Sequence, residues 1–167
     1  YERGGAIFLG DTAVLQTSDI LIPGRHNVEN YMAAIAAVDG YVDRENIEKV
    51  ARRFPGVEHR IEFVKEIGGV KFYNSSIDSS PTRTAAALRS FHQKVIVILG
   101  GYDKNIPFGP LAEPVQSCVK QAVLTGKTAG KIKQAIAHTG VPICEEDDFE
   151  QAVRKAAALA APGDIVL

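Results

Sequence analysis

The fold of this protein is decided by the stretch KVIVILGGYDKNIPFGPLAEPVQSCVKQAVLT, residues 94–125. Its apolar start predicts a strand over residues 94–99, and a helical pattern follows over 110–119. A second apolar run then predicts a strand over 122–125. A strand, a helix and a strand in this order predict two parallel strands joined by a crossover helix. The stretch therefore indicates an α/β protein.

The same alternation continues on both sides of this unit. Upstream, two apolar runs flank Gly68-Gly69, a pair typical of a two-residue β-hairpin. We expect further elements as follows: hairpin strands over 61–67 and 70–73, helices over 81–90, 129–138 and 149–159, and strands over 142–144 and 164–167. Such an order predicts a Rossmann-like, doubly wound and mostly parallel sheet with helices on both faces.

The N-terminal part of the chain has a different rhythm. Helical spacing predicts one helix from Arg25 to Val38 and a second from Asp43, its N-cap, to Phe54, where Pro55-Gly56 ends it. Three short apolar segments precede them and predict a small β-meander over 6–9, 12–15 and 20–22. Three short strands cannot close a core alone. We therefore place a domain boundary near residues 54–57.

Composition and charge exclude several classes of protein. With 46% hydrophobic and 23% charged residues, the 167-residue chain has the composition of a globular protein. Its 19 basic and 20 acidic side chains give a net charge of -1, so we expect no nucleic-acid partner. No apolar run is long enough to span a membrane. Cys118 and Cys144 are far apart, which favours a reducing, cytoplasmic compartment.

Two loops are candidate ligand sites, because ligands of an open parallel sheet bind beyond the carboxyl ends of its strands. The loop after Tyr73 carries four serines before a predicted helix. Ser79 or Ser80 capping that helix is one interpretation, and an anion site at the helix N-terminus is the other. The loop after Leu99 offers Gly100-Gly101 for close backbone approach and Lys104 as a point charge.

Three more polar residues lie before the predicted sheet. Asn27 and Asn30 are one turn apart at the start of a helix, and they either cap it, through Asn27, or read a purine edge. Arg60 is either a surface residue or a phosphate ligand. Neither a dinucleotide fingerprint nor a P-loop occurs, and no His and carboxylate cluster has metal-ligand spacing, so we predict no metal site in this chain.

Taken in order, these motifs resemble the Mur ligase family from about Leu9 to Leu167. The resemblance is carried by His26-Asn27-x-x-Asn30, Phe54-Pro55-Gly56-x-x-His59-Arg60, Gly69-Val70-x-Phe72-x-Asn74-x-Ser76 and Leu99-Gly100-Gly101-x-Asp103-Lys104. It implies that residues 1–54 are the C-terminal end of a central ATP-binding domain, without its P-loop. Residues 55–167 would then form a Rossmann-like C-terminal domain truncated at its end. We accordingly expect a piece of a longer protein.

The resemblance also implies a function. It fits best the members that add D-glutamate to UDP-N-acetylmuramoyl-L-alanine through an acyl phosphate, in peptidoglycan precursor synthesis. ATP and Mg²⁺ would be bound mainly by the preceding part of the central domain, and the piece alone would be an inactive, cytoplasmic monomer. Two alternatives stay open, a folylpolyglutamate synthase-like amide ligase and a non-catalytic α/β binding module.

The site residues implied by the resemblance fall on the motifs. Asn27 and Asn30 match adenine contacts, Arg60, Asn74 and Ser75 match nucleotide-binding positions, and Ser76 and Ser79 match substrate-binding ones. Lys104 matches a lysine at the amino-acid substrate and is the expected catalytic residue. Two positions depart from the family pattern, with Ser75 in place of an aspartate and Ile77 in place of a frequent lysine. Ser79, Arg83 and Lys104 are expected to compensate for the lost cation.

Overall fold

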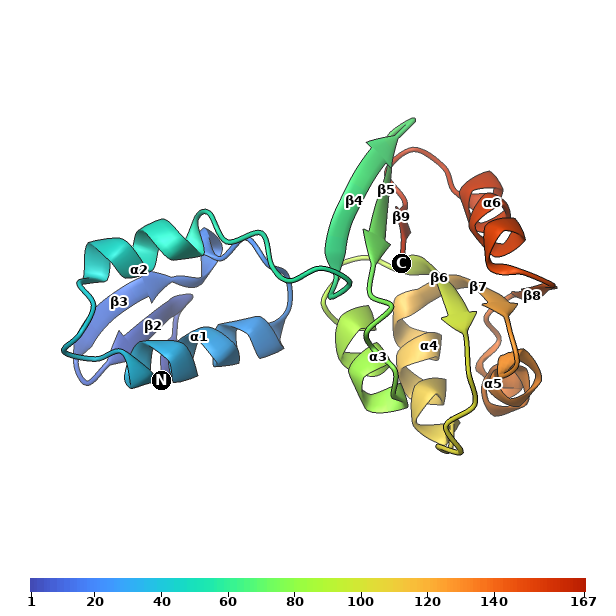
Figure 1. The fold of residues 1–167 in the computed structure, drawn as a ribbon, viewed down its shortest axis with the longest axis horizontal. Coiled ribbons are helices and arrows are strands. Elements are labelled where there is room, and N and C mark those ends of the chain that lie inside the picture. The colour runs from blue at the N-terminus through green and yellow to red at the C-terminus, as the bar shows by residue number, and fades with distance from the viewer. The chain divides into compact units, whose positions relative to one another are not determined.

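The computed structural model describes residues 1–167, which form two compact units (Figure 1). The N-terminal unit comprises residues Tyr1–Val57 and the C-terminal unit residues Glu58–Leu167. None of their helices is long and apolar enough to cross a bilayer, and the longest, α1, has 13 residues.

The N-terminal unit packs two helices on a small antiparallel sheet. Its elements are β1 (Glu2–Arg3), β2 (Ala6–Leu9), β3 (Thr12–Gln16), α1 (Arg25–Ala37) and α2 (Arg44–Ala51). Ile7 and Leu15 of the sheet, Ile35 of α1 and Ala51 of α2 are buried together and form its core. The predicted strands 6–9 and 12–15 and the first helix are confirmed.

The predicted strand over residues 20–22 is wrong. A 3₁₀ turn at Thr17–Asp19 redirects the chain, and the third strand of the sheet is β1 instead. The Leu21 N–H donates to the Ala51 carbonyl oxygen at 3.4 Å, which ties this segment to the end of α2. The second helix starts after Asp43, as predicted, but Asp43 makes no side-chain capping bond and α2 ends at Ala51, before Phe54.

The C-terminal unit is a six-stranded sheet in the order β4-β5-β9-β6-β7-β8. Its strands are β4 (Glu62–Ile67), β5 (Val70–Asn74), β6 (Val95–Gly100), β7 (Val119–Thr125), β8 (Ile143–Glu146) and β9 (Ile165–Val166). Its helices are α3 (Pro81–Leu88), α4 (Ala112–Cys118), α5 (Ala129–Ile136) and α6 (Phe149–Leu159). Only β4 runs antiparallel to its neighbour, so the predicted mostly parallel sheet is confirmed.

Helices cover both faces of this sheet, as a doubly wound fold requires. Successive residues of β6 point to opposite faces, so Val95 and Val97 pack in the core formed with α3, α4 and α5. Ile96 lies in the second core, which contains Ala152 and Ala156 of α6. Figure 1 shows α6 alone on its side of the sheet. The prediction of helices on both faces is therefore confirmed.

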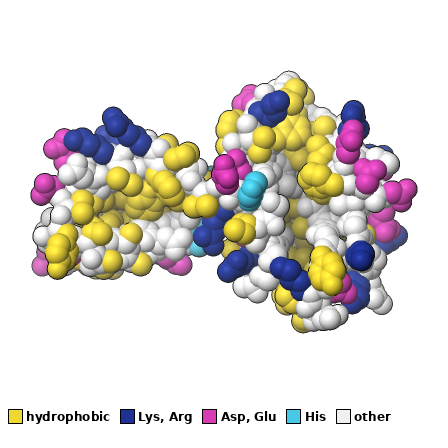
Figure 2. Space-filling model, viewed as in Figure 1, with side chains coloured by type: hydrophobic (Ala, Val, Ile, Leu, Met, Phe, Trp, Pro, Cys, Tyr) yellow, Lys and Arg dark blue, Asp and Glu magenta, His cyan; other side chains and the backbone are white.

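Local details follow from single residues. Gly68 and Gly69 both have positive φ, at 57° and 78°, which the predicted two-residue hairpin between β4 and β5 requires. Val119 was expected to end a helix but begins β7, because this β-branched side chain is buried in the core. Apolar side chains lie over β4 in Figure 2, and Phe63, Val64 and Ile67 of this edge strand are each more than half exposed.

Candidate functional site

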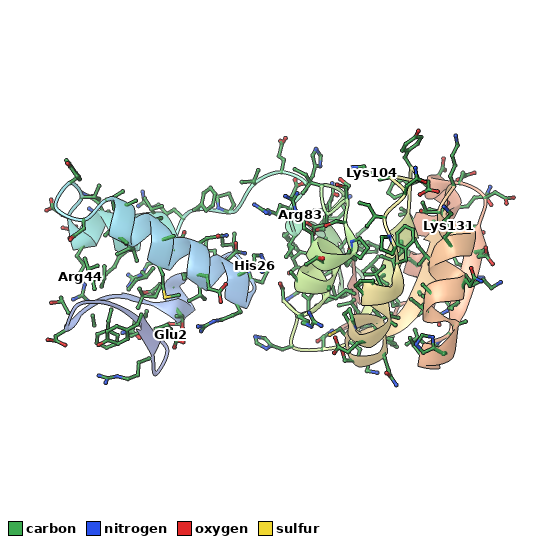
Figure 3. All side chains as sticks on the ribbon, turned by 90° about the horizontal axis from the view of Figure 1, so that it is seen from below. Glu2, His26, Arg44, Arg83, Lys104 and Lys131 are labelled. Atoms are coloured by element: carbon green, nitrogen blue, oxygen red, sulfur yellow. The ribbon has the colours of Figure 1, made fainter.

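The predicted ligand loops of the C-terminal unit lie at one edge of its sheet. The strands β5, β9 and β6 are parallel neighbours, so the loops after Asn74 and after Gly100 leave the same edge. Figure 3 views the protein from below, the side to which the arrowheads of β5 and β6 point in Figure 1. Arg83, Lys104 and Lys131 are labelled there on the C-terminal unit.

The serines in the loop at the end of β5, residues 74–80 (the serine loop), differ in whether their hydroxyls bond within the protein. Ser80 is the N-cap of α3 and accepts a hydrogen bond from the Arg83 N–H at 3.5 Å, with Pro81 in the first turn. The capping interpretation is therefore confirmed for Ser80. The side chains of Ser76 and Ser79 are exposed and make no hydrogen bond within the protein. Those two hydroxyls are free for a ligand.

Ser75 and Asn74 are engaged within the protein. The Ser75 Oγ accepts from the Ile61 N–H at 3.1 Å and donates to Asp78 Oδ2 at 2.5 Å. The Asn74 Nδ2 lies 2.9 Å from His59 Nδ1, and its Oδ1 accepts from the Ser76 N–H at 3.0 Å. Both predicted nucleotide-binding residues therefore join the serine loop to the turn around Arg60.

Arg60 lies at the tip of an unusual turn. Its neighbours His59 and Ile61 have positive φ, at 63° and 48°, although neither is glycine. The Arg60 side chain is exposed and makes no ion pair or hydrogen bond. A free guanidinium with a fixed backbone is suited to binding phosphate.

The loop after β6 presents Lys104 in a similar way. The Asp103 carboxylate accepts from Lys131 Nζ at 2.5 Å and from the Asn105 N–H at 2.9 Å. These two bonds hold the pKa of Asp103 below its usual range, and the bond from Lys131 has the larger effect. The Lys104 ammonium has no partner, because its acidic neighbour is already neutralised by Lys131.

No sequence motif predicts Lys131 as the partner of Asp103, since the two residues are 28 positions apart. Beside this loop lies an open hollow of about 510 Å³, whose walls include Asn105, Phe108 and Gln134. Lys131 also borders this hollow, and Lys104 does not.

Two glycines let the ends of β6 and β7 come close. A Cβ on Gly100 would lie 1.8 Å from the Thr125 carbonyl oxygen, and one on Gly126 would lie 3.1 Å from the Gly101 N. Gly101 itself has a φ of 122°, which favours glycine. The Gly100-Gly101 pair therefore has a structural requirement in addition to any close approach of a ligand.

Asn27 and Asn30 lie in the N-terminal unit. Gly24 is the N-cap of α1, so the interpretation of Asn27 as the helix cap is wrong. Asn27 is buried, donates from Nδ2 to the Pro23 carbonyl oxygen at 2.7 Å and accepts from Asn30 Nδ2 at 3.3 Å. Asn30 is exposed and keeps its amide oxygen and one N–H free, which is the donor and acceptor pair that an adenine edge matches.

No group of three His, Cys, Asp or Glu side chains in the chain is placed to hold a metal ion. The site residues that the sequence missed are His59, Asp78 and Lys131, which hold the two loops and the Arg60 turn. Only His59 belonged to a recognised motif.

The chain is thus a doubly wound α/β protein with free cations and hydroxyls on loops at the carboxyl edge of its sheet, the edge at which proteins of this class bind ligands. The chain belongs to the Mur ligase family, since the model of the Mur ligase glutamate ligase domain matches residues 59–167.

Curated relatives cover nearly the whole chain. It is 49% identical over 172 residues to the UDP-N-acetylmuramoylalanine–D-glutamate ligase of Clostridium beijerinckii, covering 99% of this chain and 38% of the relative. It is 51% identical over 165 residues to the ligase of the same name from Acetivibrio thermocellus, covering 94% and 35%. The chain thus spans little more than a third of the length of these relatives.

Solved structures share the fold at low sequence identity. The UDP-N-acetylmuramate–alanine ligase of Thermotoga maritima superposes with a TM-score of 0.70 and 18% identity, covering 88% of this chain and 34% of that one. Mycobacterium tuberculosis folylpolyglutamate synthase, solved with ADP, gives a TM-score of 0.68 at 13% identity, covering 89% and 38%. At these identities the similarity concerns the fold alone.

Proposed function

We propose that this chain is the C-terminal part of an ATP-dependent amide ligase that joins D-glutamate to UDP-N-acetylmuramoyl-L-alanine in peptidoglycan precursor synthesis. The observation that carries the proposal is the identity of 49–51%, over at least 94% of the chain, to ligases named for this reaction. Because the chain spans little more than a third of those relatives, we assign the activity to the full-length ligase.

In this proposal the chain contributes parts of two domains. Residues 1–54 are assigned to the end of the central ATP-binding domain and residues 55–167 to the C-terminal domain. ATP supplies the phosphoryl group that activates the acceptor carboxylate. Mg²⁺ is assigned to the preceding part of the ligase, since no residue group of this chain fits a metal ion. ATP and UDP-linked substrates are cytoplasmic metabolites, so the reaction is placed in the cytoplasm.

Four polar residues are assigned to the nucleotide. The free amide oxygen and N–H of Asn30 suit the adenine edge, and Asn27 holds Asn30 in place through a 3.3 Å hydrogen bond. The unpaired guanidinium of Arg60 suits a phosphate. Asn74 keeps one N–H of its amide for a ligand.

The carboxyl edge of the C-terminal unit is assigned to D-glutamate. Lys104 is the main cation, because its ammonium is unpaired while Lys131 neutralises the adjacent Asp103. The free hydroxyls of Ser76 and Ser79 supply neutral hydrogen bonds. Ile77 cannot bind an anion, and Arg83 on α3 is exposed and has no side-chain partner, so Arg83 is the second cation available to a dicarboxylate.

The full-length ligase tests this proposal directly. ADP release should require ATP, UDP-N-acetylmuramoyl-L-alanine and D-glutamate together, and L-glutamate should not replace the D isomer. The isolated chain of 167 residues should release no ADP above the background of a P-loop-free control protein. ADP release that depends on a folate acceptor instead would favour the folylpolyglutamate synthase-like alternative. Absence of any amide product would leave the chain as a binding module.

A further inference from the structure

The turn that carries Arg60 has a backbone that must be held in place. His59 and Ile61 adopt φ values of 63° and 48°, a region that residues with a Cβ rarely occupy. The β-branched Ile61 is the more unusual of the two, and its side chain is only 6% exposed. Such a conformation costs free energy and persists only where the surrounding structure fixes it.

Hydrogen bonds from the serine loop fix this turn. The Ile61 N–H donates to Ser75 Oγ at 3.1 Å, and the Ile77 N–H donates to the His59 carbonyl oxygen at 3.3 Å. The Asn74 Nδ2 contacts His59 Nδ1 at 2.9 Å. A fourth bond, from the His59 N–H to Glu62 Oε2 at 2.8 Å, closes the turn from its other side.

Ser75 is the central member of this group. Its hydroxyl has one proton, which it donates to Asp78 Oδ2 at 2.5 Å, and this charged acceptor orients the oxygen toward the Ile61 N–H. Asp78 is itself tied to helix α3, because its carbonyl oxygen accepts from Thr84 Oγ1 at 3.1 Å. A continuous series of hydrogen bonds therefore runs from α3 through Asp78 and Ser75 to the backbone beside Arg60.

We propose that Ser75 and Asp78 are positioning residues for Arg60, holding the strained turn so that its guanidinium is placed for a nucleotide phosphate. The inference rests on the proposed function, since it takes ATP as the ligand of Arg60. It differs from a direct contact between Ser75 and the ribose. The Ser75 proton is already donated, so Ser75 could donate to a ribose oxygen only by breaking the bond to Asp78.

Deoxynucleotides distinguish the two roles in the full-length ligase. In Ser75→Ala the KM for ATP should rise about 3- to 10-fold, the loss of one ordinary hydrogen bond. The rise should be the same for 2′-deoxy-ATP and 3′-deoxy-ATP, because a positioning residue does not touch the sugar hydroxyls. Ser75→Thr keeps the hydroxyl and should restore the KM to within about twofold of the wild type.

A double-mutant cycle with Arg60 provides the second test. In an Arg60→Ala background, Ser75→Ala should raise the KM for ATP by less than about twofold further, since the group being positioned is absent. Asp78→Asn keeps a neutral acceptor for the Ser75 proton and should fall between the wild type and Ser75→Ala. Ser117→Ala is the matched control, because the Ser117 hydroxyl also bonds only within the protein, on α4, and its loss should leave the KM unchanged.

Two results would overturn the positioning role. One is a rise in KM in Ser75→Ala that disappears with either deoxynucleotide. The other is a rise in the KM for ATP that is as large in the Arg60→Ala background as in the wild type. If Ser75→Ala does not fold, Asp78→Asn carries the same comparison, with the wild type and Ser75→Thr as its references. A wild-type protein that binds ATP without forming the amide would refute the proposed function alone, because the coupling of Ser75 to Arg60 is then measured by ATP titration. A wild type that binds no ATP would refute both.

Discussion

Gly100 ends β6 at a point where the structure has no room for a side chain. It pairs with Thr125 of β7, and a Cβ at this position would lie 1.8 Å from the Thr125 carbonyl oxygen and 2.7 Å from its carbon. Real Cβ contacts stay above 3.0 Å, so in Gly100→Ala the two strands must separate by at least about 1.2 Å. The obstacle is backbone, which cannot rotate away as a side chain would.

The size of the effect follows from this contact. Overpacking that side chains can relieve lowers the free energy of unfolding by about 1 to 3 kcal/mol. The cost of separating two central strands should be at or above the upper end of this range. The neighbouring Leu99 and Leu124 are buried in the same core, so the displacement also disturbs packing. We expect Gly100→Ala to lower the free energy of unfolding by about 3 kcal/mol or more, which lowers the Tm of a unit of this size by roughly 10 °C or more.

Thermal unfolding of the 167-residue chain by calorimetry measures this loss. Gly130→Ala is the matched control, because Gly130 lies in α5 and nothing lies within 4 Å of its added Cβ. That variant should be about 0.5 to 1 kcal/mol more stable than the wild type, since alanine is the better helix former. A Gly100→Ala variant that melts within about 2 °C of the wild type would refute the reasoning, because the strands would then accommodate the methyl group freely.

Three further predictions concern the charged and polar groups. Lys104→Met in the full-length ligase should raise the KM for D-glutamate roughly 10- to 100-fold, and that for ATP much less, whereas Lys155→Met, an exposed control on α6, should change neither. Asn30→Ala should weaken ATP binding by about 1 to 3 kcal/mol in a calorimetric titration, and an unchanged affinity would remove Asn30 from the adenine site. The Ala161 N–H and then Lys120 lower the pKa of Asp164, so its contribution to stability is complete above the ordinary value of 3.8 and is lost as the pH falls through the lower folded-state pKa. Urea unfolding should accordingly give Asp164→Asn a lower free energy of unfolding than the wild type at pH 7 and a smaller loss of it as the pH falls. Parallel curves of the free energy of unfolding against pH for the two proteins would contradict this.

The sequence predicted where several site residues lie, but not what their side chains do. The motifs located Asn74 and Ser75, yet their bonds to His59 and Ile61 join parts of the chain 15 and 14 residues apart. A motif specifies spacing along the chain and does not specify which hydroxyl proton is already donated. The same holds for Asp103, whose partner Lys131 is supplied by α5.

The sequence by itself determined the order and type of nearly all the elements. Apolar runs, helical spacing and the Gly68-Gly69 pair are local signals, and local signals suffice to predict strands, helices and tight turns. The predicted strand over residues 20–22 was wrong because an apolar run does not reveal whether a partner strand is available. In the folded protein the third strand is β1, which pairs with β2 and not with β3.

The tertiary structure alone decided which polar groups remain free. Arg60, Lys104 and Asn30 keep unpaired donors, whereas Ser75, Ser80 and Asp103 are satisfied by partners inside the protein. A donor or acceptor forms its bond with whichever group the fold brings within about 3 Å, and that distance depends on strand order and helix packing, which local sequence does not encode.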